Sequence, residues 1–277
     1  MTRASGALMP AMLASALALA SAGPVAGQEL RYSGSVGYYT GSYIFGDRTE
    51  SVAVLNGLSL SRGRLSLTAT LPLIAQTSTS VSFLGGGMMP TGGPDHGEVT
   101  QGHAGGMSMG DGFDVTPGDP VVRVSYRVVQ GVSAPRVLTV EALAKAPVAP
   151  LSSGIGTGAW DVGVGASGMA VLGGTMVLGA LSVWSPGDLP ELVLREYADV
   201  TLGLGRAFAE RWSLLVSVNA ATTIVEALPA PASLGMSAGL RTDGGGNWTM
   251  AVSSGLTEAS PDLALTVGWT APPWGVR

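Results

Sequence analysis

Two groups of residues in this chain could do chemistry, and the first lies between Met88 and Met109. Both histidines of the chain, His96 and His103, occur there with four of its eleven methionines. Thioether sulfur and imidazole nitrogen are ligands for copper, and Cu(I) prefers the soft sulfur. The glycine-rich spacing has no fixed geometry, so a plain surface loop or a partial plug of an interior is the alternative interpretation. The predicted copper ligands are His96, His103, Met107 and Met109.

The second group consists of charged residues that alternate with apolar ones along short segments. Segments that follow one another in the sequence carry opposite charges, which can pair across neighbouring strands about 5 Å apart. We expect these side chains to line an enclosed interior, either as a structural ion-pair network or as a filter that selects solutes. The predicted lining residues are Arg123, Arg127, Glu141, Lys145, Asp161 and Asp199.

Catalysis has little support in the sequence. The chain has no Cys, and both histidines lie in the glycine-rich segment instead of on a predicted strand. A nucleophile needs an oriented base, and a glycosidase needs paired carboxylates, and neither arrangement can be identified. We therefore predict that the chain is not an enzyme and has no cofactor other than the copper considered above.

The composition is unusual for a soluble domain. Charged residues make up 12% and hydrophobic residues 46% of the 277 residues, with 42 glycines, whereas soluble domains contain about 25% charged residues. The formal net charge is -5, and Lys145 is the single lysine among fourteen basic residues, which form no cluster. Nucleic acid is therefore not an expected partner.

The first 27 residues have the order of a secretory signal peptide. Arg3 precedes an apolar stretch from Ala7 to Ala20, and small residues follow it. A membrane-anchoring helix is the alternative, but this stretch is shorter than the roughly twenty residues that span a bilayer. We predict cleavage after Ala22 or Gly27, and removal of 1–27 leaves 28–277 as the mature chain.

The remainder of the chain shows the alternation of apolar and polar residues that is typical of strands. Between Gly63 and Leu71, apolar residues occupy the odd positions, and Arg, Ser or Thr occupy the even ones. This period of two separates the faces of a strand, whereas a helix would mix them. About twelve strands are predicted, near 30–39, 49–60, 63–74, 119–130, 136–146, 158–170, 173–184, 196–208, 211–223, 235–242, 247–255 and 261–270.

The connections between these segments alternate between short turns and longer loops, of which 75–118 is the longest and carries the Gly, Met and His residues. Short turns at one rim and long loops at the other are typical of an outer-membrane barrel. Closure satisfies the backbone in lipid. The fold class is therefore all-β, an antiparallel transmembrane β-barrel of about twelve strands after a cleaved signal peptide. A secreted β-sandwich is the alternative, although its solvent face would need more charge. Aromatic residues expected in interfacial girdles are Tyr32, Tyr38, Trp160, Trp184, Trp212, Trp248 and Trp269.

Four phrases, in this order along the chain, carry a resemblance to a known family. They are Tyr43-Ile44-Phe45-Gly46-Asp47, Gly118-Asp119-Pro120, Lys145-Ala146-Pro147 and Gly156-Thr157-Gly158-Ala159-Trp160-Asp161. The set resembles the family of outer-membrane barrel transporters named for the meta-pathway of phenol degradation. The resemblance implies a barrel of about twelve strands with a role in uptake of hydrophobic or aromatic compounds. The chain departs from the pattern in its long 75–118 loop and in its ending, which lacks a terminal aromatic residue.

These observations predict a protein of the outer membrane of a Gram-negative bacterium. Its expected partners are outer-membrane lipid and a small-molecule solute, with no nucleic acid. The predicted function is that of a passive transporter or channel for small compounds, hydrophobic or aromatic by resemblance. The alternative is a structural or binding barrel without transport, handling copper through the Met/His loop.

The copper hypothesis has a direct test. We expect the purified protein to form a titratable complex with copper, because the soft sulfur and imidazole groups gather in one segment. Replacing both His96→Ala and His103→Ala should abolish that complex in a calorimetric titration. An unchanged affinity in the double variant would remove these residues as ligands.

Overall fold

The computed structural model describes residues 27–44, 48–78, 81–84, 87–90, 115–131, 136–150, 153, 155–156, 158–187, 194–226 and 228–275. Within these residues the regular structure is almost entirely β-strand. In the same part of the chain, no helix is both long enough and apolar enough to cross a membrane. Apart from Gly27, the predicted signal peptide lies outside the described residues.

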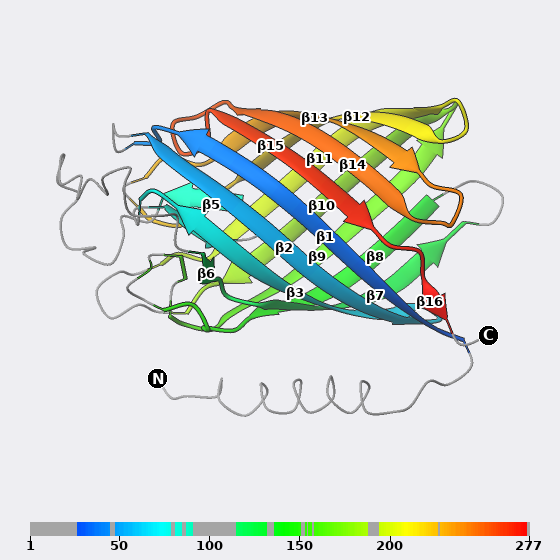
Figure 1. The fold of residues 1–277 in the computed structure, drawn as a ribbon, viewed down its shortest axis with the longest axis horizontal. Coiled ribbons are helices and arrows are strands. Elements are labelled where there is room, and N and C mark those ends of the chain that lie inside the picture. The colour runs from blue at the N-terminus through cyan, green and yellow to red at the C-terminus, as the bar shows by residue number, and fades with distance from the viewer. Residues whose placement is uncertain are drawn as a thin grey trace.

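Twelve long antiparallel strands form one closed barrel (Figure 1). Each strand pairs with the next along the chain, and the last closes on the first in a register that runs from Ser33 opposite Thr270 to Thr40 opposite Leu263. Closure gives the edge strands partners for their N–H and C=O groups, as lipid requires. The strands are β1 (Gln28–Gly41), β2 (Thr49–Arg62), β3 (Leu65–Gln76), β7 (Val121–Gln130), β8 (Arg136–Lys145), β9 (Asp161–Leu172), β10 (Thr175–Ser185), β11 (Tyr197–Phe208), β12 (Trp212–Ala221), β13 (Ala232–Arg241), β14 (Asn247–Gly255) and β15 (Leu263–Thr270).

The prediction of an antiparallel barrel of about twelve strands is thus confirmed, and the predicted strand ends differ from the observed ones by at most three residues. Four short strands were not predicted. Two of them, β4 (Val81–Leu84) and β5 (Gly87–Pro90), form a separate hairpin inside the segment expected to be a loop. The others, β6 (Thr116–Pro117) and β16 (Trp274–Gly275), extend the barrel sheet beside β3 and β1. These four segments are too short to show a period of two.

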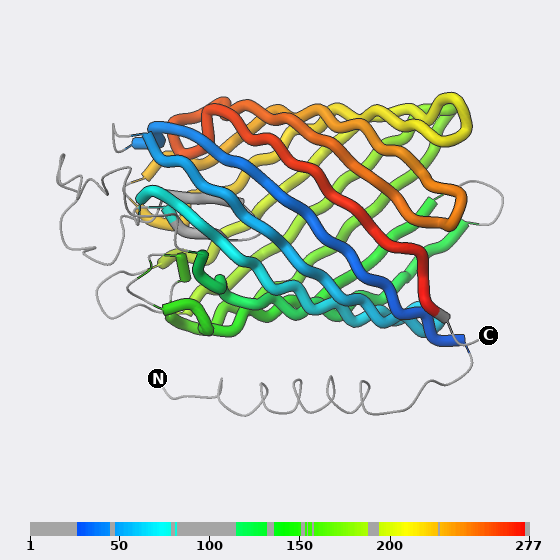
Figure 2. Tube along the Cα trace, viewed as in Figure 1, coloured from blue at the N-terminus to red at the C-terminus, as the bar shows by residue number. Residues whose placement is uncertain are grey.

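The connections alternate in length as predicted. Figure 2 shows tight turns at one end of the barrel, where β1 begins and β15 ends, and longer connections at the other end. One tight turn consists of Gly173 and Gly174, whose φ angles of 58° and 83° are both positive. Glycine adopts this conformation without steric cost, and two such residues form the turn that best fits the twist of a hairpin. We call the two ends the short-turn rim and the long-loop rim.

The two faces of each strand meet different surroundings. Leu202 and Leu204 on β11 point outward and are 62% and 61% exposed, and similar apolar side chains cover the rest of the wall. Inside the barrel, the Thr68 hydroxyl donates a hydrogen bond to the Ser59 hydroxyl over 3.1 Å. An apolar exterior around a polar interior is the arrangement of a barrel that is surrounded by hydrocarbon.

The expected aromatic girdle is only partly correct. Trp212 and Trp248 are exposed on the outer wall at the short-turn rim, and Trp269 lies 5.8 Å from Trp248 between ring centroids. Trp184, in contrast, was wrongly assigned to the girdle, because its side chain is 5% exposed and points into the barrel. It lies two positions from inward-facing Ser182, to whose hydroxyl its indole N–H donates a hydrogen bond, so the period of two puts both on the inner face.

The outer wall makes a depth-dependent prediction. Leu202 lies midway along β11, whereas Leu172, which is 65% exposed, ends β9 at the short-turn rim. We expect Leu202→Arg to lower the free energy of unfolding by about 2–4 kcal/mol and Leu172→Arg by about 1 kcal/mol or less, because a cation at mid-bilayer is the more poorly solvated. Urea titration of the protein folded in liposomes measures both. Equal losses would contradict a lipid-covered wall.

Candidate functional site in the barrel interior

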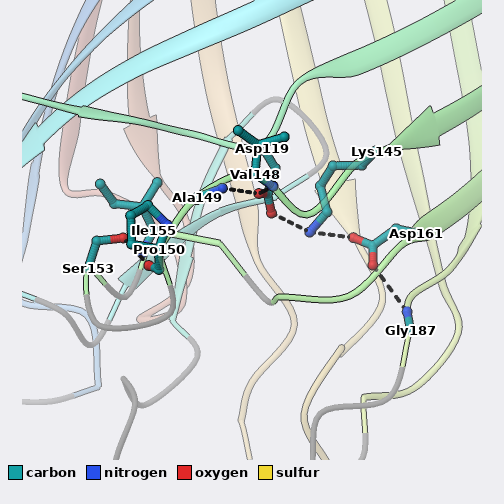
Figure 3. Close-up of polar contacts among 9 residues, drawn as sticks. All are labelled: Asp119, Lys145, Val148, Ala149, Pro150, Ser153, Ile155, Asp161 and Gly187. Atoms are coloured by element: carbon teal, nitrogen blue, oxygen red, sulfur yellow. Dashed lines mark hydrogen bonds and ion pairs between the residues drawn. The ribbon is translucent and has the colours of Figure 1, made fainter.

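A buried cluster of three charges lies inside the barrel close to the long-loop rim. Lys145 ends β8, and it lies opposite Asp161, the first residue of β9. The Lys145 Nζ atom is 2.7 Å from Oδ2 of Asp161 and 3.2 Å from Oδ2 of Asp119. Figure 3 shows the ammonium group between the two carboxylates. All three side chains are at least 96% buried, and charges at that depth persist only when paired and hydrogen-bonded.

The remaining carboxylate oxygens of this cluster hold the loops. Oδ1 of Asp119 accepts hydrogen bonds from the backbone N–H groups of Val148 and Ala149, both over 2.8 Å. Oδ1 of Asp161 accepts one from Gly187 N–H over 3.1 Å (Figure 3). Three long connections, 77–120, 146–160 and 186–196, are therefore joined at one buried point.

The charged cluster includes a residue that was not among the predicted site residues. Asp119 belongs to the phrase Gly118-Asp119-Pro120 and starts the predicted strand 119–130, but the alternation is interrupted at Pro120, and in the structure Asp119 precedes β7. Gly156, from another of the four phrases, lies against it. A Cβ atom at Gly156 would come within 2.6 Å of Oδ2 of Asp119 and 2.7 Å of the Ala149 Cβ, so glycine is required there for the close approach.

An apolar cluster packs against the inner wall beside these charges. Leu143, Trp184 and Tyr197 from the strands contact Leu194 and Ile224 from the long connections. The Trp184 and Tyr197 rings are stacked, with centroids 6.4 Å apart and planes inclined by 9°. Offset aromatic pairs of this kind add to the stabilisation that burial already gives. The apolar cluster therefore narrows the interior at the long-loop rim.

Asp199 lies next to this apolar cluster. Its carboxylate accepts a hydrogen bond from the Ser182 hydroxyl, which in turn accepts one from the indole N–H of Trp184. The chain of hydrogen bonds links a predicted lining residue to the stacked rings. It fixes the orientation of the Trp184 side chain on the inner wall.

The first long connection is also anchored in the interior. Tyr43 packs with Val81 of the β4–β5 hairpin and with Tyr39, and the Gln76 amide donates a hydrogen bond to the Val81 carbonyl over 3.1 Å. Burial raises the pKa of the Tyr43 hydroxyl, and the nearby Asp262 carboxylate raises it further. Tyr43 is therefore neutral at physiological pH and acts as an apolar anchor.

Deeper in the barrel the interior is less tightly packed. On β7, Arg123 Nη1 lies 3.5 Å from Glu141 Oε2 on β8, and the Arg123 side chain is 51% exposed although it points inward, whereas that of Glu141 is 10% exposed. Further towards the short-turn rim, Arg127 Nη1 donates a hydrogen bond to Gln130 over 3.2 Å. The six predicted residues are thus spread along the barrel axis and do not converge on one point.

The predicted copper ligands lie outside the part of the chain that the structure describes. His96, His103, Met107 and Met109 all lie in the segment 91–114, outside the described residues. Copper binding by this segment therefore stays a prediction from the sequence.

The fold and its interior define a closed twelve-stranded barrel with an apolar outer wall and a lined lumen. No family model matches the chain, and no curated protein matches it. Among solved structures, an outer membrane channel from Pseudomonas putida F1 superposes with a TM-score of 0.63 at 12% identity, covering 90% of this chain and 97% of the channel. This likeness shows the fold.

Two further structures are more distant. The β domain of the Bordetella autotransporter BrkA gives a TM-score of 0.45 at 9% identity, covering 89% of this chain and 99% of that domain. The toluene transporter TodX of P. putida gives 0.36 at 10% identity, with 91% of each chain covered. Both scores lie below 0.5, so the assignment of the fold rests on the P. putida F1 channel.

The charged cluster makes a prediction about stability. Lys145→Met keeps the length of the side chain but leaves two buried carboxylates without their cation, which should cost about 3–5 kcal/mol of unfolding free energy. Urea titration in detergent micelles measures the loss. Adding Asp161→Asn to Lys145→Met should restore part of it.

Arg195 provides the matched control for this measurement. It pairs with Glu226 at the same rim, but both side chains are exposed, so Arg195→Met should cost about 1 kcal/mol or less. If Lys145→Met costs no more than Arg195→Met, the charged cluster does not hold the loops.

Proposed function

We propose that this chain is an outer-membrane channel of a Gram-negative bacterium that passes small apolar or aromatic compounds passively. The proposal has three parts, which are the place of the barrel in the membrane, the passage through it and the class of solute. Each part is supported by a different feature of the structure.

The location is supported by the outer wall. Exposed apolar side chains cover the strands on the outside, from Leu58 on β2 to Val216 on β12. A surface of this extent and character requires an apolar surrounding. The likeness to an outer membrane channel of P. putida F1 points the same way. The lipid partner of the barrel is then the hydrocarbon of the outer membrane.

The passage is supported by one observation above all, which is the exposure of Arg123. Its guanidinium points into the barrel and pairs with Glu141, yet half of its side chain remains accessible. A barrel filled solidly by its own side chains would bury such a residue. The interior at this level therefore has space beside a charged pair, as a polar solute path needs.

The class of solute is supported by the apolar cluster nearer the long-loop rim. A compound that enters there passes a constriction formed by the packed side chains of Leu143, Trp184 and Tyr197, each 5% exposed or less, before it reaches the charged pair. Because this constriction offers few hydrogen-bond partners, an apolar or aromatic compound loses less on passing it than a sugar, which gives up hydrogen bonds to water. The resemblance to the phenol-degradation family of outer-membrane barrels adds independent support for aromatic compounds.

Liposome swelling with solutes of similar size tests the proposal. We expect a small aromatic alcohol to enter proteoliposomes faster than a sugar of comparable volume. Trp184→Ala should reduce this discrimination, because loss of the indole widens the passage beside the apolar cluster and lets the sugar enter several-fold faster. Trp212→Ala, which removes a tryptophan from the outer wall, is the matched control and should leave the solute preference unchanged.

Two results would count against the proposal. Absence of swelling with every solute, together with absence of conductance in planar bilayers before and after deletion of 91–114, would favour a structural barrel without transport. Entry of sugars and aromatic compounds at equal rates would leave a channel but remove the proposed solute class.

A further inference from the structure

Basic residues are unevenly distributed between the two rims. Among the residues that the structure describes, the short-turn rim has three acids, namely Glu29, Glu210 and Asp243, whereas acids predominate at the long-loop rim. The basic residues at the short-turn rim are all arginines: Arg31, Arg62, Arg64, Arg127, Arg136, Arg206, Arg211 and Arg241. This rim therefore carries an excess of positive charge.

Three of these arginines lie on the outer wall. Arg206 pairs in register with Leu214, an exposed outward residue of β12. Arg136 lies two positions before outward Leu138, and Arg62 lies four positions after outward Leu58, so the period of two gives them the same orientation. All three side chains are exposed. Their stems continue the apolar wall, and their guanidinium groups lie where the wall ends.

The three guanidinium groups have no acidic partner within the described part of the chain. Two of the other five arginines at this rim have one, since Arg211 pairs with Asp243 and Arg31 with Glu29. An exposed arginine at the edge of a bilayer can extend its charged group towards the headgroup region while its methylene groups stay against apolar surface. The planar guanidinium fits two oxygens of a phosphate at once.

The positions of the three arginines around the barrel are regular. They lie on β2, β8 and β11, and two strands separate β2 from β8 and also β8 from β11 in the barrel sheet. The remaining part of the circumference carries tryptophans on the outer wall at the same rim, namely Trp212, Trp248 and Trp269. One part of the rim is thus suited to phosphate groups and the other to the apolar boundary below the headgroups.

We propose that Arg62, Arg136 and Arg206 bind the phosphate groups of anionic phospholipids in the leaflet at the short-turn rim. The N–H groups of each guanidinium donate hydrogen bonds to phosphate oxygens, and the positive charge favours a lipid with net negative charge over a zwitterionic one. The lipids occupy the outer wall, away from the interior. This site is therefore independent of the solute path and rests only on the barrel lying in a bilayer.

Native mass spectrometry of the delipidated protein in detergent tests the proposal. The protein is mixed with equal amounts of phosphatidylglycerol and phosphatidylethanolamine, and the bound lipids are counted. The wild type should retain phosphatidylglycerol preferentially. The triple variant Arg62→Gln, Arg136→Gln and Arg206→Gln should lose this preference about tenfold, as expected when several cation–phosphate contacts at a membrane surface are removed. Solute entry into liposomes should be unchanged in the triple variant, since these residues face lipid.

Arg195→Gln is the matched control, because it removes one exposed arginine at the long-loop rim and should keep the preference. Heat-dependent migration on a gel reports whether each variant is folded, and the three single variants replace the triple one if it does not fold, each with a partial loss. No preference in the wild type, a full preference in the triple variant, or an equal loss in Arg195→Gln would each overturn the proposal.

Discussion

The arrangement at the long-loop rim depends on one ammonium group that is shared by two carboxylates away from water. Lys145 has a single charge, and Asp119 and Asp161 together carry two. The surplus negative charge is stabilised by backbone N–H groups from Val148, Ala149 and Gly187. The loops are therefore parts of the solvation shell of a buried charge, and they replace the water that the carboxylates give up on folding.

This constraint explains why the described parts of the long connections lie inside the rim. The backbone that is held by the carboxylates leads directly to Ala149 and Ile155, which pack on Ile74 of the inner wall. The same arrangement brings Leu194 of the connection 186–196 next to Trp184 and Tyr197. Polar and apolar contacts thus cooperate at one level of the barrel, while the interior below it keeps accessible surface around Arg123.

Local patterning was sufficient to predict the barrel. Alternation on segments such as 65–71 reports directly which side chains face out, and the alternating loop lengths give the topology. Orientation failed at Trp184, because a tryptophan at a strand end suits both an interface and a core. The inward position of Trp184 depends on Gly163 of the neighbouring strand, where a Cβ atom would lie 2.8 Å from the Trp184 ring. This contact can be predicted only when the register of the two strands is known.

Less of the candidate site than of the fold could be predicted from the sequence. Pairs between adjacent strands, such as Arg123 with Glu141, follow from charge and order along the chain. The role of Asp119 does not follow from charge and order, because in the structure it precedes its strand, and its hydrogen-bond partners are about thirty positions away. Three of the four phrases that carried the family resemblance contain the three charges of the buried cluster. These short phrases therefore marked residues of the site that the period of two did not identify.

The closing seam of the barrel has a consequence for biosynthesis. Ser33 pairs with Thr270, 237 positions later, and this contact joins the first long strand to the last. Every other neighbouring pair of long strands can form from a nearby connection, but this pair can form only after β15 and the ten long strands between it and β1 have been synthesised and arranged. Until then both terminal strands expose unpaired edges that can join to other chains. Folding of this protein is therefore limited by a late, long-range step, during which the nascent chain needs protection from its own copies.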